Sequence, residues 1–267
     1  MRADKHKPRL RKSAGDEVRA KKFLGQHFLT DESIAMDIVD SCTCVVPRLL
    51  EIGPGMGVLT KYLVKKEDID FCAIEIDRES VEYLNVHYPL LRVVEGDFLK
   101  MDLSSLFHDS FAIIGNFPYN ISSQILFRLY ENRDMIPELV GMFQKEVAER
   151  VAAVPGNKSY GILSVLLSAF YDIEYLFTVP EHVFNPPPKV KSAVIRLRRN
   201  GVKDLGCDQA LFEKIVKTGF NQRRKTMRNA LRQLNTDISV VPEKYLQSRA
   251  EQLSVSDYIH ITQLLSL

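Results

Sequence analysis

The chain has 267 residues, of which 45% are hydrophobic and 26% are charged, and its formal net charge is only +2. This composition predicts one large domain with a smaller one attached. It argues against a membrane protein, because no apolar run reaches the roughly 18 residues that a bilayer requires. The basic N-terminus has no apolar segment behind it, which argues against a secretory signal and favours a cytoplasmic protein.

Positive charge is concentrated in two stretches of the chain. Residues 1–22 carry nine Lys or Arg and three Asp or Glu, and residues 214–232 carry seven Lys or Arg and no acid. Two basic blocks on an otherwise acidic body favour a polyanion as partner. Residues 1–20 are also poor in large apolar side chains. For the first block, a solvated tail that is disordered without a partner is therefore as well supported as polyanion binding.

The first ordered segment is aromatic and contains a glycine. Residues 22–29 read Lys-Phe-Leu-Gly-Gln-His-Phe-Leu and lead into a helix predicted to start at 30–32. The segment either packs the N-terminus onto the core or serves a site. Its polar pair, Gln26 and His27, is unusual for pure packing.

A strand, a glycine-rich turn and a helix follow. Residues 48–52 form an apolar strand, residues 53–57 read Gly-Pro-Gly-Met-Gly, and residues 58–63 begin a helix. Glycines let the backbone approach a ligand closely, with the N–H groups of the helix start nearby. The spacing is GxGxG, which argues against NAD or FAD, although such turns also occur for geometric reasons alone.

The next two strands end in acids. The strand at 71–77 places Glu75 where an acid can accept hydrogen bonds from both ribose hydroxyls of a nucleoside. The strand at 91–95 is followed by Asp97, which can accept from an exocyclic amine, and by Phe98, which can lie along an adenine face. Because the carboxyl ends of parallel strands share one edge, these residues predict a nucleotide site.

A fourth strand begins at Ala112 and ends in Asn116-Phe117-Pro118-Tyr119. This loop offers an amide, a proline that fixes one backbone angle and an aromatic face. Such groups can hold and orient a flat, hydrogen-bonding ring. The loop is therefore the predicted centre of the site.

The rest of the pattern predicts an α/β domain followed by helices. Helices are expected at 120–129, 145–150 and 162–170, and strands at 139–144, 172–179 and 192–198. Phe184 precedes a rigid Pro-Pro-Pro turn, where its ring either packs the turn or stands at the mouth of a pocket. Residues 201–206 form a linker, and the pattern is helical from Asp208 to the end.

One stretch of this last region, residues 220–232, combines an apolar stripe with a dense basic helix face. Arginine forks suit phosphates, so we interpret this face as binding nucleic acid rather than as merely solvated. The residues that carry the prediction are Arg223, Arg224, Lys225 and Arg228.

Cysteine usage predicts no metal centre. Cys42 and Cys44 are one residue apart, which is neither a zinc knuckle nor a redox CxxC, and Cys72 and Cys207 stand alone. Free buried thiols are the expected state.

Seven motifs together resemble one enzyme family. They are residues 23–29, 51–57, 75–77, 96–98, 116–119, 185–190 and 220–225. In this order they resemble the ribosomal RNA adenine N6-dimethyltransferases, most closely the small-subunit (KsgA) type, from about residue 20 to the C-terminus. The resemblance implies a Rossmann-like class I methyltransferase sheet of seven strands (residues 21–200) and a small C-terminal helical, RNA-binding domain (residues 201–267).

The resemblance also implies chemistry and partners. S-adenosylmethionine would donate methyl groups to two adjacent adenosines near the 3′ end of 16S (small-subunit) rRNA, and we expect a monomer acting on a pre-assembled 30S particle. Cofactor-binding positions by motif match are Gln26, His27, Leu29, Gly53, Gly55, Glu75, Ile76, Asp97, Phe98 and Asn116. Asn116 and the Phe117 carbonyl would accept the N6 hydrogens beside Pro118, with Tyr119 and Phe184 stacking on the base.

The chain departs from the family pattern at two positions. The family commonly has Asn where His27 stands, so a cofactor contact there is expected through the backbone. It commonly has Leu where Phe117 stands, and because the carbonyl is retained we expect little change in chemistry.

Three other functions remain open. The first is a large-subunit rRNA adenine methyltransferase, which shares most of the motifs. The second is a DNA adenine methyltransferase, which is disfavoured because the sequence shows no extra target-recognition domain. The third is an assembly or RNA-binding factor, in which the catalytic site would be unused. The Gln222 to Thr226 segment and the Pro-Pro-Pro-Lys turn favour the small-subunit type.

Overall fold

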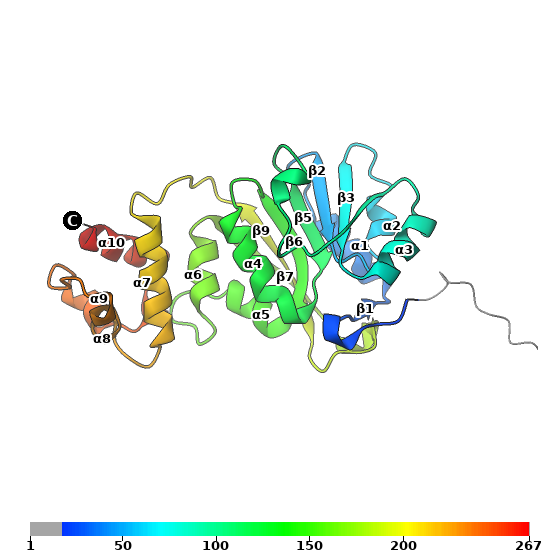
Figure 1. The fold of residues 1–267 in the computed structure, drawn as a ribbon. Helices are drawn as coiled ribbons and strands as arrows, with labels where there is room; N and C mark the ends of the chain where they lie inside the picture. The colour runs from blue at the N-terminus through cyan, green and yellow to red at the C-terminus, as the bar shows by residue number, and fades with distance from the viewer. Residues whose placement is uncertain (1–17, 267) are drawn as a thin grey trace, which may run out of the picture.

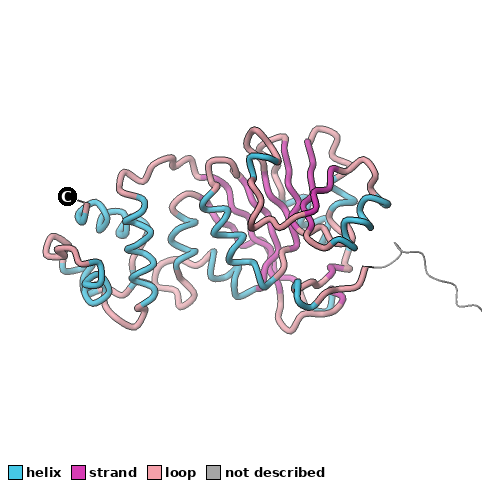
Figure 2. Tube along the Cα trace, viewed as in Figure 1, coloured by secondary structure: helices cyan, strands magenta, loops and turns pink. Residues whose placement is uncertain are grey.

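A computed structural model describes residues 18–266, so most of the predicted basic tail lies outside the described residues. Seven strands form one sheet (Figures 1 and 2). Their order across the sheet is β4 (Arg92–Glu95), β3 (Asp70–Glu75), β2 (Arg48–Ile52), β5 (Ala112–Asn116), β6 (Glu138–Gln144), β9 (Ser192–Arg199) and β7 (Tyr171–Val179). The first five strands are parallel, and β9 lies antiparallel between β6 and β7. The predicted α/β sheet of seven strands is confirmed.

Helices cover both faces of the sheet, because the central strands are apolar on both sides. In β5, Ile113 packs into one buried cluster while Ala112 and Ile114 pack into the other. The helices that precede or connect these strands are α1 (Glu32–Ser41), α2 (Thr60–Leu63), α3 (Arg78–His87), α4 (Ser122–Glu131), α5 (Lys145–Val151) and α6 (Ile162–Ser168). The predicted start of α1 is confirmed, since the Asp31 carboxylate accepts hydrogen bonds from the N–H groups of Ser33 and Ile34.

Four more helices follow the sheet. They are α7 (Gln209–Asn221), α8 (Met227–Leu231), α9 (Glu243–Gln247) and α10 (Val255–Leu265). Short 3₁₀ turns lie at Lys22–Leu24, Leu103–Ser105, Tyr119–Ile121, Glu181–Val183, Arg232–Leu234 and Ala250–Gln252. No helix within residues 18–266 is long and apolar enough to cross a bilayer.

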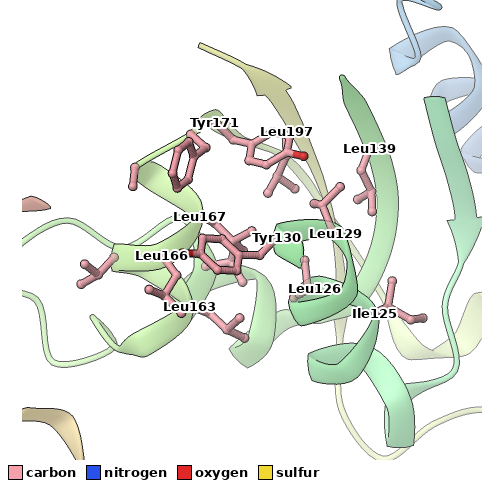
Figure 3. Packing of buried hydrophobic residues seen from close by; sticks show 14 of the residues in the cluster. Ile125, Leu126, Leu129, Tyr130, Leu139, Leu163, Leu166, Leu167, Tyr171 and Leu197 are labelled. Carbon is pink, nitrogen blue, oxygen red and sulfur yellow. The ribbon is translucent and has the colours of Figure 1, made fainter. Parts of the chain in front are cut away.

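One buried cluster runs from the sheet into the C-terminal helices. Figure 3 shows Tyr130 of α4 beside Leu166 and Leu167 of α6, with Leu197 of β9 close by. The same cluster continues through Phe212 of α7 to other side chains of the C-terminal helices. The domain division at residue 201 stays a prediction, because the chain leaves the sheet there but the core is continuous.

The predicted basic helix at 220–232 is wrong. Helix α7 ends at Asn221, a turn follows, and α8 begins at Met227. The Met227 N–H donates to the Ser248 carbonyl at 2.8 Å instead of continuing a helix, and Thr226 pairs with Arg249 as an isolated bridge. Tertiary hydrogen bonds thus override the local helical pattern, and the basic residues lie in and after a turn.

Candidate active site

A cavity of about 410 Å³ lies at the carboxyl ends of β2, β3, β4 and β5. Its volume falls within the range of small-molecule sites. All ten residues predicted to bind a cofactor line it, as do Phe117, Pro118 and Tyr119. The structure therefore brings together predicted residues spread from position 26 to position 119, as the strand-end argument predicts.

The glycine turn forms one wall. Gly53, Gly55 and Gly57 all have positive φ, at 67°, 56° and 80°, which L side chains rarely adopt. A β carbon at Gly55 would also lie 2.8 Å from the Phe28 ring. The turn therefore requires glycine both for its backbone and for the close approach of the N-terminal segment.

A buried carboxylate ties this turn to the next strand. The Glu75 side chain accepts hydrogen bonds from the N–H groups of Gly55 at 3.0 Å and of Ile76 and Asp77 at 2.9 Å. Burial nevertheless raises the pKa of Glu75, because desolvation outweighs these bonds. Glu75 thus holds the cavity wall together.

Glu51 is a second buried acid at the cavity, and the sequence indicates it only as part of a motif. It is 1% exposed, and the Thr60 hydroxyl donates to its carboxylate at 2.6 Å. Burial raises the pKa of Glu51 to about 8. An acid inside an apolar strand that runs into a glycine turn is the signal that could have singled it out.

The Asn116 amide is oriented by the N-terminal segment. Its Nδ2 donates to the His27 carbonyl at 3.1 Å, and the Phe117 N–H donates to the Met142 carbonyl at 3.1 Å. Among residues 18–266 no group donates to Asn116 Oδ1. The loop therefore keeps an amide oxygen available at the cavity.

Tyr119 is held from two sides. Its ring centroid lies 5.3 Å from that of His27, and its hydroxyl contacts the Ser192 hydroxyl at 2.5 Å, at the start of β9. His27 Nδ1 in turn lies 2.8 Å from the Pro186 carbonyl oxygen. Burial raises the pKa of Tyr119, so this phenol stays protonated near neutral pH.

Phe184 is not brought to the cavity. It forms β8 (Phe184–Asn185), which pairs with β1 (Phe28–Leu29), and the residue is 4% exposed in the cluster that contains Leu29. Phe184 therefore has a packing role, and the alternative that it stands at the mouth of the pocket is wrong. Because the side chain is buried in this cluster, the arrangement does not support stacking of Phe184 on a base.

The N-terminal segment is fastened across the cavity. Gln26 Nε2 donates to Asp77 at 3.3 Å, and Lys21 forms an ion pair with the same carboxylate. Lys21 and Gln26 thus bind Asp77, the N-cap residue of α3. The segment does more than pack the N-terminus onto the core. The sequence predicts a site role for Gln26, whereas it gives no such indication for Lys21 or Asp77.

The four predicted RNA-binding residues differ in their partners. Arg223 donates to the Lys158 carbonyl at 2.5 Å and lies 3.8 Å from Glu251, and Arg228 pairs with Glu243. Arg224 and Lys225 are exposed, and no acid of the described chain pairs with them. In Figure 1 the end of α7, after which the basic turn begins, and β1, whose residues line the cavity, both lie toward the lower side of the molecule.

The fold and the cavity define a class I methyltransferase. Residues 17–266 match the family described as ribosomal RNA adenine dimethylase, and the chain belongs to that family. The chain is 59% identical over 255 residues to ribosomal RNA small subunit methyltransferase A of Cytophaga hutchinsonii, covering 94% of this chain and 99% of that protein. The protein of the same name from Bacteroides thetaiotaomicron is 57% identical over 251 residues, covering 92% and 93%.

Solved structures agree with this fold. A dimethyladenosine transferase from Plasmodium falciparum superposes with a TM-score of 0.72 at 25% identity, covering 88% of this chain and 96% of that chain. The 23S rRNA methyltransferase ErmE superposes with a TM-score of 0.68 at 23% identity, covering 90% and 100%. The second likeness concerns the fold alone.

Proposed function

We propose that this enzyme uses S-adenosylmethionine to dimethylate the N6 atoms of two adjacent adenosines near the 3′ end of 16S rRNA. The name of its relatives supports the small subunit, and the family supports adenine as the acceptor. The observation that carries the reaction is the Asn116 amide, held by the His27 carbonyl with its oxygen available at the cavity.

The cavity suits the proposed cofactor. Gly53 and Gly55 allow a close backbone approach, Glu75 lies where a ribose would be met, and Asp97 offers an acceptor for an adenine amine. The buried carboxyl groups of Glu51 and Glu75 also line the cavity, where they suit a ligand that carries hydroxyl groups. When bound, S-adenosylmethionine supplies an electrophilic methyl group on a sulfonium.

The protein's own contribution is orientation. Asn116 Oδ1 and the Phe117 carbonyl accept the two hydrogens of the target amine, which favours a pyramidal nitrogen with an available lone pair. Tyr119 lies along the base after it leaves its stack. Holding the nitrogen in line with the methyl group contributes up to about 7–11 kcal/mol in favourable cases. No general base is required, because the alkylated nitrogen loses its proton readily.

The RNA is proposed to approach along the side that carries the basic turn. Arg224 and Lys225 suit phosphates by charge and exposure, whereas Arg223 and Arg228 already have protein partners. We further propose that the enzyme acts as a monomer in the cytoplasm, on a pre-assembled 30S particle. A bound particle would also allow a checkpoint role in assembly.

The proposal is tested by methylating immature small subunits with labelled S-adenosylmethionine and mapping the modified adenosines. We expect two adjacent dimethylated adenosines near the 3′ end of 16S rRNA. Large-subunit rRNA and free 16S rRNA serve as parallel substrates. Label confined to large-subunit rRNA would refute the assignment, and label on free 16S rRNA alone would refute the requirement for an assembled particle.

A further inference from the structure

Two cysteines lie together at the edge of the sheet opposite the cavity. Cys42 ends α1 and Cys44 lies two residues on, in the loop that leads to the amino end of β2. Their sulfur atoms are 3.6 Å apart, and both thiols are free. The methyl-transfer site involves neither residue, because the cavity lies at the carboxyl ends of the same strands.

A buried carboxylate fixes the loop that carries them. Glu138 of β6 is fully buried and accepts hydrogen bonds from the Thr43 N–H at 3.1 Å and the Thr43 hydroxyl at 2.7 Å. Its second oxygen lies 3.7 Å from the Cys42 sulfur. The Cys44 backbone has a φ of 47°, in the left-handed region that non-glycine residues rarely occupy. The surroundings therefore hold the two sulfurs close in a conformation that the chain would not choose alone.

The two thiols are unequal. Cys42 is 5% exposed, whereas Cys44 is half-buried and reachable from solvent. The hydrogen bond with Cys42 lowers the pKa of Cys44 and Lys66 acts in the same direction, which together outweigh the opposite effects of burial and of the Glu138 carboxylate. The reactive form of a thiol is the thiolate, so Cys44 is the sulfur that reacts first.

We propose that Cys42 and Cys44 form a thiol–disulfide switch that is oxidised by low-molecular-weight disulfides. The Cys44 thiolate attacks the oxidant, forms a mixed disulfide and releases one thiolate of the oxidant. Cys42 then gives its proton to solvent, attacks the Cys44 sulfur and displaces the second thiolate. The protein loses two protons and two electrons, and one oxidant disulfide is reduced to two thiols.

The other two cysteines cannot form an internal disulfide by these two steps. Cys72 lies fully buried in β3, and Cys207 is half-buried without a second thiol beside it. Cys207 can stop only at a mixed disulfide. An internal disulfide is therefore specific to the Cys42–Cys44 pair.

The test treats the full-length native protein with oxidised glutathione, followed by alkylation, digestion and mass spectrometry. We expect the peptide with Cys42 and Cys44 to lose two hydrogens and to lose alkylation at both positions, and dithiothreitol to restore both. A wild-type protein that keeps glutathione on Cys44, leaves both thiols alkylated or forms disulfides between chains would overturn the proposal.

Variants separate the two steps. Cys42→Ser should trap glutathione on Cys44, because the second attack is lost, while the matched control Cys207→Ser should leave the internal disulfide unchanged. Methyl transfer by the reduced Cys42→Ser protein reports that it is folded. Equal amounts of trapped glutathione in wild type and Cys42→Ser would contradict the role of Cys42.

Discussion

The ring of Phe117 occupies the space that a side chain at Gly141 would need. A β carbon built on Gly141 would lie 2.0 Å from Phe117 Cε2, and one on Gly115 would lie 2.7 Å from Cε1 of the same ring. Phe117 is 1% exposed and packs against Phe143 with ring centroids 4.9 Å apart. The phenylalanine of the Asn116–Tyr119 loop is thus accommodated by glycines on β5 and β6.

This relationship predicts strong coupling between Phe117 and Gly141. Gly141→Ala should destabilise the protein by about 1–3 kcal/mol, because the new methyl group overpacks the ring. In Phe117→Leu the same alanine should cost much less, since the smaller side chain leaves room for it. Urea unfolding of the two single variants and the double variant measures this interaction, and additive losses would contradict it.

Removing the Asn116 amide should separate chemistry from binding. We expect Asn116→Ala to lower kcat by roughly two or more orders of magnitude, as for loss of one precisely aimed polar group, while the affinity for S-adenosylmethionine changes much less. Steady-state methylation of small subunits measures kcat, and calorimetry measures the affinity for S-adenosylmethionine.

His27→Ala is the matched control for this prediction. It keeps the backbone carbonyl to which Asn116 donates, so the amide should stay oriented. We expect a much smaller loss of kcat than in Asn116→Ala. Near-normal turnover in Asn116→Ala would exclude the proposed role of the amide.

The site is predictable from the sequence because its residues follow the ends of strands. The edge shared by parallel strands brings Glu75, Asp97 and Asn116 to one cavity whatever the loops do. Pairings between distant segments are not visible in the local pattern. The Asn116–His27 bond spans 89 residues, and the β1–β8 pair that buries Phe184 joins segments even farther apart.

The basic segment at 220–232 is a second case in which tertiary contacts are not visible in the local sequence. Its composition predicts one helix with a basic face, but α7 ends at Asn221 and the Met227 N–H donates to Ser248 where α8 begins. The acids that neutralise Arg223 and Arg228 lie on later elements, at Glu251 and Glu243. Charge counting along the chain therefore overstates the free positive charge of this surface.

Glu51 should make stability depend on pH. Its pKa is about 8 in the folded protein because of burial and near 4.5 when unfolded. Between these values the folded state holds a proton that the unfolded state has lost, so its contribution to stability falls as pH rises through this window, by up to about 1.4 kcal/mol per pH unit. Below pH 4.5 the contribution is fully present.

Glu51→Gln should remove this contribution. Unfolding by urea at several pH values from 4.5 to 8, without cofactor, should show a flatter profile for the variant than for wild type. Glu75, whose pKa burial also raises, remains in both proteins, so only the difference between the profiles reports Glu51. Parallel profiles would mean that Glu51 is ionised in the folded protein.

The basic turn should contribute to RNA binding through Arg224 and Lys225 rather than through Arg223. Each phosphate contact that is lost lowers the slope of log K against log salt by about 0.7–0.9. Replacing both Arg224 and Lys225 with Ala should therefore weaken binding to small subunits and flatten the salt dependence by up to roughly twice that amount.

Arg223→Gln should change the slope little but lower stability, because the bond to the Lys158 carbonyl holds the turn against the α5–α6 connection. Filter binding at a series of salt concentrations distinguishes the two variants. A slope that changes with Arg223 and not with the other pair would reverse the assignment of these residues.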